Sequence, residues 1–317
     1  MNILCISFWD NAQQLQLLAE SLRKYTEHDA LHLNIQATYL DYERDLYYPD
    51  YKKSPTGILE LKEKIKGYDD FFILAELLPE DMPMKQVLEE LGIHRLLSRK
   101  NVIIRTGGSI PRNNPEHYLF AQIKHGYIYT GAYHDYSIAS KIGFVAPTRN
   151  ICPVDKIPTP NPPKDEIQIA FSPTKKEKGI EEFRRVMDSL EKEYDNVKGV
   201  AIKGKTWRES IKIKSECNIT FDQFMIRTYG NSSIESMYLS HAVLSRLDAY
   251  TRMLYPDLPV INVDTERDLY KKLKWLIENP KERRKIGEEG KKFIDKYHSP
   301  KVVVKQWEAL IEHVKST

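Results

Sequence analysis

Short runs of apolar residues alternate along most of the chain with longer segments in which apolar residues recur every three or four positions. The short runs are typical of buried strands and the longer spacing is typical of amphipathic helices. The strands predicted in the first half are Asn2–Ser7, Asn34–Tyr39, Phe71–Glu76, Asn101–Arg105 and Ile142–Ala146. Between the first two, Asn11–Leu22 carries its apolar residues on one helical face. This alternation predicts a parallel sheet covered by helices.

A proline-rich segment interrupts the alternation. Its prolines are Pro153, Pro158, Pro160, Pro162 and Pro163. Proline fixes φ and lacks an N–H group, so the segment cannot form a helix or a central strand. We interpret it as an extended linker between two domains.

After the linker the same pattern returns. The predicted strands are Ile167–Phe171, Gly199–Lys203, Asn218–Phe221, Ala242–Arg246 and Pro259–Val263. The predicted helices are Gly179–Tyr194, Thr265–Glu278 with Asp264 or Thr265 as cap, and a last helix from about Pro300. The fold class is therefore α/β, with two Rossmann-like domains that face each other across a cleft. Ligands of such sheets bind at the carboxyl ends of the strands.

The segment Tyr229–Met237, YGNSSIESM, places a glycine turn and small polar residues just before a helix. A helix start offers unpaired N–H groups and the positive end of a dipole, which suit a diphosphate. Glu235, about one turn into the helix, is placed to accept hydrogen bonds from ribose hydroxyls. The same residues also suit an ordinary helix start with Asn231 as N-cap, so both interpretations stay open.

Charge and cysteine usage narrow the class of protein. The 317 residues include 48 basic and 45 acidic ones, so the chain as a whole shows no preference for nucleic acid or membrane. The three cysteines are far apart and predict free thiols in a reducing compartment. The sequence shows neither a signal peptide nor a transmembrane segment, so we expect a cytoplasmic protein, with peripheral membrane contact left open.

Several motifs in the second half occur in the order of a known family. They are SPTKKEKG (172–179), CNITFDQF (217–224), YGNSSIESM and the tail from Leu258 to Ser299. From Phe171 to about Val314 the chain resembles the GT-B glycosyltransferases of the retaining group-1 type. In that family these motifs form a phosphate-binding loop, a strand ending in Asp-Gln and the start of the donor-binding helix.

The first half resembles the family more weakly. Residues 8–12 follow the first strand, where such enzymes bring backbone close to the donor phosphates and the acceptor. Residues 107–112 resemble a Gly-Ser-x-x-Arg loop of some relatives, and the last helix resembles a segment that crosses back onto the first domain. The resemblance implies an acceptor-side domain (1–155), a nucleotide-sugar-binding domain (164–298) and a crossing helix (299–317).

The resemblance assigns site residues to both domains. On the donor side they are Ser172, Thr174, Lys178, Gly179, Tyr229, Gly230, Asn231, Ser232, Ser233 and Glu235. On the acceptor side they are Asp10, Asn11, Ala12, Gly108, Ser109 and Arg112. No metal and no further cofactor is implied, and the donor is a UDP-, GDP- or other nucleoside diphosphate sugar.

Three positions depart from the family pattern. The first of two glutamates spaced eight residues apart is replaced by Arg227, the arginine expected before the Lys-Gly pair is replaced by Ser172, and a histidine expected near Thr106 is missing. The motifs that bind the donor in that family are therefore kept, while several residues associated with catalysis are altered.

The candidate catalytic residues are Arg227 and Asp222. Arg227 suits a diphosphate with its planar fork, or is an exposed loop residue. Asp222 orients a loop, faces the cleft, or forms a turn. Lys178 supplies a point charge to the leaving diphosphate, unless its loop is simply solvated. His117, His125 and His134 are candidate bases or structural residues, and the acidic and aromatic run Asp41–Tyr48 is a possible lining of the acceptor pocket.

The leading hypothesis is a glycosyltransferase that moves a hexosyl or pentosyl group from a nucleotide sugar, with retention, to a glycan, lipid-linked glycan, small molecule or modified DNA base. A non-catalytic nucleotide-sugar sensor or partner subunit is the alternative from another class. A nucleotide-dependent dehydrogenase is disfavoured, because no GxGxxG follows the first strand.

Overall fold

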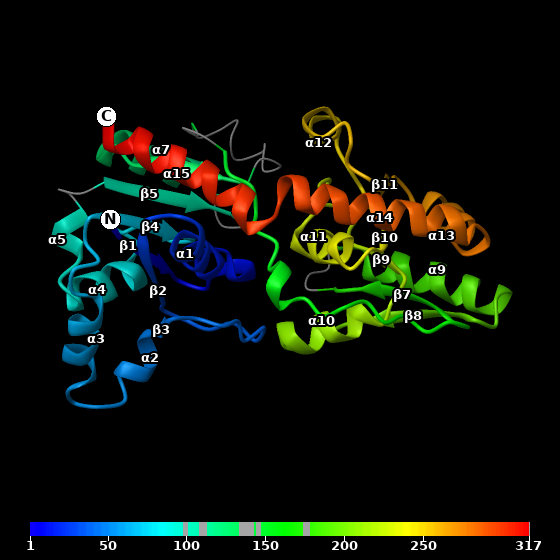
Figure 1. Ribbon diagram of the computed structural model, residues 1–317, viewed down its shortest axis with the longest axis horizontal. Coiled ribbons are helices and arrows are strands. Elements are labelled where there is room, and N and C mark those ends of the chain that lie inside the picture. Colours follow the sequence, from blue (N-terminus) through cyan, green and yellow to red (C-terminus); the bar gives the residue numbers. More distant parts are fainter. Residues whose placement is uncertain (98–100, 108–112, 133–142, 144–146, 174–177, 317) are drawn as a thin grey trace. The chain divides into compact units, whose positions relative to one another are not determined.

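The computed structural model describes residues 1–97, 101–107, 113–132, 143, 147–173 and 178–316. The chain divides into two compact units (Figure 1). The first contains Met1–Ile151 together with Pro300–Thr317, and the second contains Cys152–Ser299.

A parallel sheet of six strands forms the centre of the first unit. Its order is β3-β2-β1-β4-β5-β6. The strands are β1 (Asn2–Ser7), β2 (Asp29–Asn34), β3 (Leu46–Tyr47), β4 (Phe71–Ala75), β5 (Asn101–Thr106) and β6 (Ile128–Gly131). The parallel α/β class predicted from the sequence is confirmed for this half.

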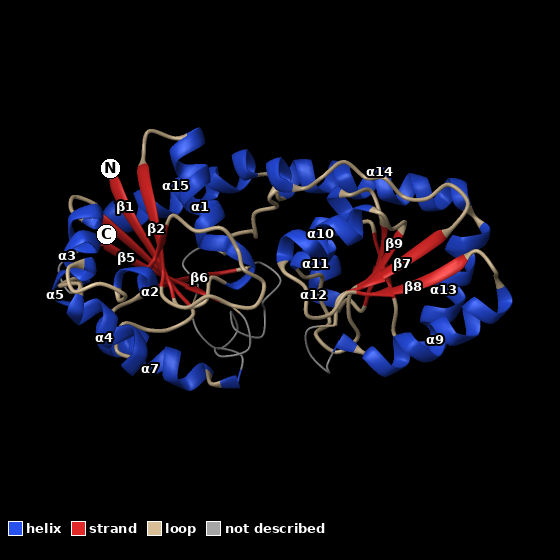
Figure 2. Cartoon of the chain, turned by 90° about the horizontal axis from the view of Figure 1, so that it is seen from below, coloured by secondary structure: helices blue, strands red, loops and turns tan. Residues whose placement is uncertain are grey.

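Helices cover both faces of this sheet (Figure 2). They are η1 (Asn11–Gln13), α1 (Gln14–Tyr25), α2 (Tyr48–Tyr51), α3 (Gly57–Ile65), α4 (Met82–Glu90), α5 (His94–Leu97), α7 (Pro115–His125) and α15 (Pro300–Ser316). Leu4 and Ile6 face one core cluster, with α3 and α4, while Ile3 and Cys5 face the other, with α1 and α15. Strands buried on both faces read as continuous apolar runs, which explains why β1 was predicted within its observed limits.

The last helix belongs to the first unit. Its buried residues Val303, Trp307 and Ile311 lie in the same core cluster as Leu15 and Leu22 of α1. Trp307 is among the largest fully buried side chains of the protein. The end of the chain therefore stabilises the unit in which the chain begins.

The second unit contains a parallel sheet of five strands in the order β11-β10-β9-β7-β8. These are β7 (Ile167–Phe171), β8 (Val197–Ala201), β9 (Ile219–Phe221), β10 (Ala242–Ser245) and β11 (Val260–Asn262). The helices are η2 (Val154–Lys156), α9 (Ile180–Glu193), α10 (Trp207–Ser215), α11 (Asn231–Tyr238), α12 (Ala249–Leu254), α13 (Glu266–Glu278) and α14 (Pro280–Tyr297). Each predicted strand of this half overlaps an observed one.

One strand was predicted in the wrong place. The second strand is Asp29–Asn34, and the predicted strand Asn34–Tyr39 begins where the observed one ends. His32 and Asn34 are buried polar residues within or at the end of it, so the apolar pattern missed the strand. The strands β3 and β6 were also missed, while most of the predicted strand Ile142–Ala146 lies outside the described residues.

Thr265 caps α13 as predicted, because its side chain accepts a hydrogen bond from the Asp268 N–H. Among the described helices, none has the length and apolar character needed to cross a bilayer.

Candidate functional site

The strand order of the second unit places its candidate site. Between β7 and β9 the sheet has a switch point, because β8 continues on one side of β7 and β9 on the other. In open parallel sheets, ligands bind outside the carboxyl ends of the strands at such a point. The loop with Lys178 follows β7, and Asp222 follows β9 directly.

The partly exposed Lys178 forms an ion pair with the buried Asp222, with 2.8 Å between Nζ and Oδ1. The second carboxylate oxygen, Oδ2, accepts hydrogen bonds from the Gly230 N–H at 3.1 Å and the Ser233 hydroxyl at 2.6 Å. Burial alone would raise the pKa of Asp222, but Lys178 and these hydrogen bonds hold it below the usual range. Asp222 is therefore a carboxylate that joins Lys178 to the start of α11.

The start of α11 differs from the prediction in one respect. Gly230 is the N-cap and Asn231 is the first helical residue, so the prediction of Asn231 as N-cap is wrong. Gly230 has no side chain to cap the helix, and the carboxylate of Asp222 takes this part. A Cβ at Gly230 would lie 3.3 Å from Asp222 Oδ2, so a small residue suits this close approach.

Glu235 is held by two partners that the sequence did not indicate. Its Oε1 accepts from Trp207 Nε1 at 2.8 Å, and its Oε2 accepts from Lys214 Nζ at 2.7 Å. Lys214 is 2% exposed and also donates to the Ser232 hydroxyl at 3.0 Å. Each carboxylate oxygen has two acceptor sites, so Glu235 keeps capacity for further hydrogen bonds.

The backbone of Gly179 explains why a glycine follows Lys178 in the motif that the resemblance assigns to phosphate binding. It has φ +87° as the N-cap of α9, a conformation that other residues rarely adopt. A Cβ at this position would lie 2.5 Å from the ring of Phe224, which follows β9. The glycine therefore lets the loop that carries Lys178 pack closely on the segment after Asp222.

The remaining predicted donor residues are placed differently. Arg227 is exposed, and its side chain has no hydrogen-bond or ion-pair partner among the described residues. Tyr229 is fully buried, where its hydroxyl bonds to His298 at 3.0 Å, so its side chain is structural. The Ser172 hydroxyl is enclosed without a partner in the described part of the chain. Thr174 lies outside the described residues.

The first unit has its own switch point, between β1 and β4. Glu76 follows β4, and its carboxylate accepts from the backbone N–H groups of Trp9 at 3.1 Å, Asp10 at 3.4 Å and Asn11 at 2.8 Å. The loop after β1, expected to turn backbone toward phosphates, thus directs these three N–H groups at Glu76. Ala12 has a left-handed backbone with φ 57°. Gly108, Ser109 and Arg112 lie outside the described residues.

Asp10 lies in this loop, and its side chain caps the start of α1. Its Oδ1 accepts from the Leu15 N–H at 2.8 Å and its Oδ2 from the Gln16 N–H at 3.2 Å. Burial, and then the charge of Glu76, raise the pKa of Asp10 to about 7, although both backbone hydrogen bonds and Arg105 lower it. Asp10 is thus a buried carboxyl that titrates near neutral pH.

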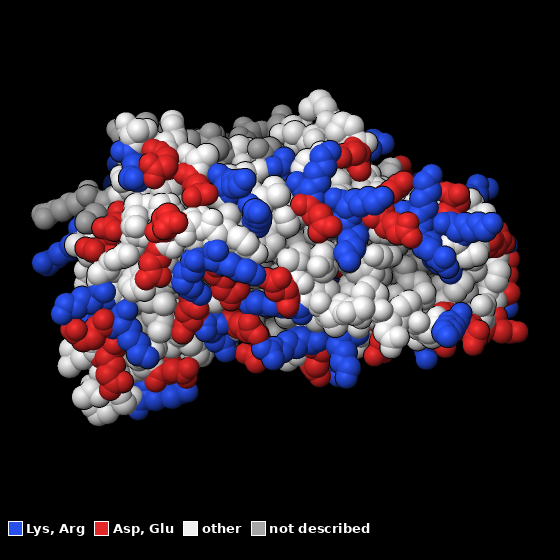
Figure 3. Space-filling view, in the orientation of Figure 1, with Lys and Arg blue, Asp and Glu red and all other residues white. Residues whose placement is uncertain are grey.

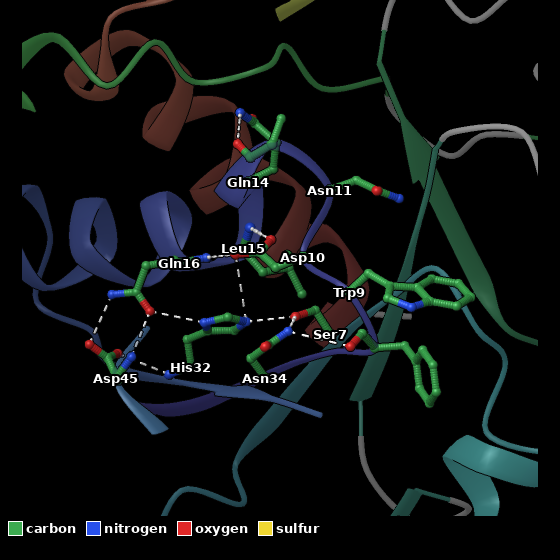
Figure 4. A network of polar contacts seen from close by, with 12 residues as sticks. Ser7, Trp9, Asp10, Asn11, Gln14, Leu15, Gln16, His32, Asn34 and Asp45 are labelled. Atoms are coloured by element: carbon green, nitrogen blue, oxygen red, sulfur yellow. Dashed lines mark hydrogen bonds and ion pairs between the residues drawn. The ribbon is translucent and has the colours of Figure 1, made fainter. Parts of the chain in front are cut away.

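His32 lies beside Asp10, with 3.8 Å between Nε2 and the carboxylate Oδ2 (Figure 4). Gln16 Oε1 accepts from the Asp45 N–H, so the contact of 2.9 Å between Oε1 and His32 Nδ1 requires Nδ1 to donate. Nε2 then accepts from the Ser7 hydroxyl at 2.8 Å. Burial lowers the pKa of His32 to about 3, so the ring is neutral.

A small, partly open pocket lies beside these groups, and its enclosed part has room for about one water molecule. It is lined by Trp9, Asp10, His32, Asn34, Ala37, Thr38, Tyr42, Glu43 and Arg44. Part of the run Asp41–Tyr48, whose role was open from the sequence, thus lines a pocket. His32 and Glu76 were missed; the signal for Glu76 was a carboxylate directly after a buried strand.

The histidines considered as bases lie elsewhere. His117 bonds to Asp81 at 2.8 Å, and His125 lies 3.8 Å from Glu80 and stacks on Tyr127. His134 is outside the described residues. Within the described ranges, no three histidine, cysteine or acidic side chains gather in a way that would hold a metal ion.

No protein-family model matches the sequence, and the search of curated proteins found no match. Solved structures do match the whole fold. HepE of Anabaena in complex with UDP and glucose aligns with a TM-score of 0.68 at 9% identity, covering 98% of this chain and 100% of that chain. Its fold is of the GT-B class. Our chain has the GT-B fold.

Two further matches show the range of proteins with this fold. Sucrose-phosphate synthase from Thermosynechococcus elongatus aligns with a TM-score of 0.62 at 12% identity, with full coverage of both chains. A putative UDP-N-acetylglucosamine 2-epimerase from Listeria monocytogenes aligns with a TM-score of 0.60 at 11% identity, covering 100% of this chain and 98% of that chain. Among these matches the GT-B fold occurs both in a synthase and in a putative epimerase. The fold alone therefore does not determine the reaction, which depends on the residues of the site.

Proposed function

We propose that the protein transfers a sugar from a nucleoside diphosphate sugar to a hydroxyl group of an acceptor. The observation that carries this proposal is the meeting of Lys178, Asp222 and the start of α11 at the switch point of the second sheet. The matching structure of HepE contains UDP, so a uridine diphosphate sugar is the first donor to test.

The arrangement suits a leaving diphosphate. Negative charge grows on the diphosphate as the bond to the sugar breaks, and fixed positive groups lower the energy of that state. The Lys178 ammonium has three donor hydrogens, of which Asp222 accepts one. The positive end of the α11 dipole adds a second favourable field. Asp222 keeps both groups in place before the donor arrives.

Glu235 is the proposed ribose ligand. Lys214 and Trp207 each hold one of its oxygens, so its carboxylate keeps one position. A fixed acceptor loses little conformational entropy when it binds a ribose hydroxyl. The resemblance to group-1 enzymes further implies retention of the anomeric configuration and catalysis without a metal.

Titration calorimetry with UDP, GDP, ADP and dTDP, with and without a chelator, tests the donor site. We expect at least one diphosphate to bind and Lys178→Met to weaken it by about 10- to 100-fold, since a charge-assisted hydrogen bond contributes about 1.5–3 kcal/mol. The matched control is Lys281→Met on the exposed surface of α14, which should bind normally. Binding of none of the diphosphates, or normal binding by Lys178→Met, would refute the proposed site.

The exposed position of Arg227 favours a second candidate, a nucleotide-sugar-binding protein without transferase activity. Incubation with UDP-glucose and UDP-N-acetylglucosamine, followed by NMR, separates the candidates. A glycosylated acceptor or slow donor hydrolysis supports transfer, and the product's anomeric coupling tests retention. An epimerised sugar indicates an epimerase, and unchanged donor despite tight binding supports the sensor.

A DNA acceptor is less favoured. In Figure 3, basic and acidic side chains are interspersed over the visible face of the molecule. Duplex binding uses clustered Lys and Arg to neutralise phosphates. A salt-dependent affinity for DNA would revive this alternative.

A further inference from the structure

We propose that the loop after β1 is an anion-binding site that the protein fills with its own carboxylate, Glu76. Glu76 then gives the loop its shape and keeps the phosphate groups of a ligand away from the backbone N–H groups of the loop. This inference goes beyond the proposed function, since it concerns only the first unit and does not depend on the donor site of the second.

Backbone N–H groups of three consecutive residues converge on Glu76. The carboxylate Oε1 accepts from Asn11 at 2.8 Å, and Oε2 accepts from Trp9 at 3.1 Å and from Asp10 at 3.4 Å. These residues follow one another along the loop drawn in Figure 4. Consecutive N–H groups that point to one place form a concave site that favours an anion. Glu76 is therefore held in the way that a bound anion is held.

The backbone of the loop needs such a partner. Asp10, Ala12 and Gln13 have φ values of 50°, 57° and 50°. Residues other than glycine rarely adopt this left-handed backbone, and it persists only where surrounding contacts maintain it. The three hydrogen bonds to Glu76 are contacts of this kind. An external ligand is therefore not required to keep the loop in its present shape.

Glu76 is itself fixed in place. It follows β4, the neighbour of β1 across the switch point of the sheet. Its own φ is 71°, and its carbonyl accepts a hydrogen bond from the Tyr118 hydroxyl at 2.6 Å. Tyr118 is fully buried in α7. Two elements of the fold thus hold Glu76 where its side chain reaches the loop.

The charges around Glu76 disfavour a second anion. Glu76 is 5% exposed, and the ionisable groups that act on it and on its neighbour Asp10 include Arg105 and, beside Asp10, His32. Burial raises the pKa of Glu76, whereas the loop N–H groups and then the charge of Arg105 lower it. Asp10 has a pKa of about 7 and adds negative charge as it ionises. A phosphate placed here would meet the negative charge of Glu76 and be repelled.

This arrangement departs from the expectation drawn from the family resemblance. The backbone after the first strand was expected to approach the donor phosphates, but its N–H groups are given to a carboxylate of the same chain. As long as Glu76 occupies them, they contribute nothing to the binding of a diphosphate. The contact is thus inhibitory toward phosphate at this loop.

Chemical rescue of Glu76→Ala in the full-length protein tests the site. The substitution removes a methylene group and the carboxylate, and acetate reproduces these groups. Thermal unfolding is measured in sodium acetate, in sodium chloride of the same ionic strength, and in acetamide, a neutral molecule of similar shape, all at neutral pH. The matched control is Leu61→Ala, which opens a cavity in the apolar core of the same unit without exposing N–H groups of the loop.

We expect Glu76→Ala to be less stable than the wild type and to be stabilised specifically by acetate. Acetate at roughly ten times its Kd should raise the Tm of the variant by about 3–6 °C. Acetamide should not, and acetate should not stabilise the wild type or Leu61→Ala beyond the effect of chloride. Glu76→Gln should also lose stability without rescue, because its amide group points a donor at the loop and leaves no space for acetate.

A measurement on the wild type covers the case in which Glu76→Ala fails to fold. The backbone amide signals of Trp9, Asp10 and Asn11 should be protected from hydrogen exchange, because Glu76 accepts from all three. Neither acetate nor inorganic phosphate should shift these signals, since the site is already filled.

The inference is overturned if acetate fails to stabilise a folded Glu76→Ala or stabilises Leu61→Ala equally. It is also overturned if Glu76→Gln is as stable as the wild type, or if phosphate shifts the three amide signals in the wild type. Absence of UDP binding would refute the proposed function and leave this inference standing, so the two failures are distinguishable.

Discussion

Asp10→Asn should change the pH dependence of stability. The Asp10 carboxyl is 3% exposed, and its pKa is raised from 3.8 to about 7, first by burial and then by Glu76. Between these two pH values the native state keeps a proton that the unfolded chain has released. The native state therefore gains stability as the pH falls through this window, and the ionised carboxylate destabilises it above about pH 7.

The magnitude follows from the pKa shift. One pKa unit corresponds to 1.36 kcal/mol, and about two units of the window lie between pH 5 and pH 7. From pH 5 to pH 8 the wild type should therefore lose about 3 kcal/mol relative to Asp10→Asn. Asparagine tolerates the left-handed backbone at this position, where φ is 50°. The amide nitrogen of asparagine cannot accept a hydrogen bond, so the variant loses one of the two bonds from the Leu15 and Gln16 N–H groups. This loss costs about 1 kcal/mol and does not depend on pH.

Urea unfolding of both proteins at pH 5, 6, 7 and 8 measures this difference. Groups that do not interact with Asp10 cancel in the comparison, whereas Glu76, whose charge acts on Asp10, contributes to it. The matched control is Asp50→Asn, which removes an exposed carboxylate of the same unit. It should show a much smaller pH dependence. A stability difference between Asp10→Asn and wild type that is constant with pH, or that turns against the variant as the pH rises, would refute the reasoning.

Four further substitutions test the packing and the proposed donor site. Gly179→Ala should lower the free energy of unfolding by at least about 1–2 kcal/mol, because φ is +87° and the added Cβ would lie 2.5 Å from the Phe224 ring; unchanged denaturation would contradict this. Trp307→Ala should lower it by about 3–5 kcal/mol and release α15, seen as new proteolysis at the C-terminus; a stable, uncut variant would show that α15 is dispensable. Lys214→Met should destabilise by about 3–5 kcal/mol, because Glu235 is left as an unpaired buried charge, and adding Glu235→Gln should recover part of the loss; no recovery would mean that the pair is not coupled. Glu235→Gln alone should weaken UDP binding by about 1–3 kcal/mol in calorimetry, and equal affinity would exclude it as the ribose ligand.

The contacts at the proposed donor site were largely predictable from the sequence. Lys178, Asp222 and Ser233 stand in short motifs at strand ends or helix starts, and the structure brings their side chains together. A parallel sheet places the carboxyl ends of all its strands at one edge, so local motifs there become neighbours. Arg227 could not be judged in this way, since the direction of a loop side chain depends on the whole loop.

The first unit was less predictable, because its site depends on distant partners. Glu76 binds the N–H group of Asn11, which is 65 positions away in the sequence. His32 is held between Gln16 and Ser7 from two other elements, which lets a histidine lie fully buried inside a strand. The apolar pattern counts such residues as exposed, and it therefore displaced the second strand.

The sequence by itself determined the α/β class, the Pro-rich break, the approximate limits of most strands and the segments that form the proposed donor site. These properties depend on hydrophobic periodicity and on glycine and proline, which act within a few residues. Only the tertiary structure decided that Asp222 caps α11, that Lys214 holds Glu235 and that Asp10 is a carboxyl titrating near neutral pH. The reason is that burial and partner charges, which set hydrogen bonding and pKa, come from segments far apart in the chain.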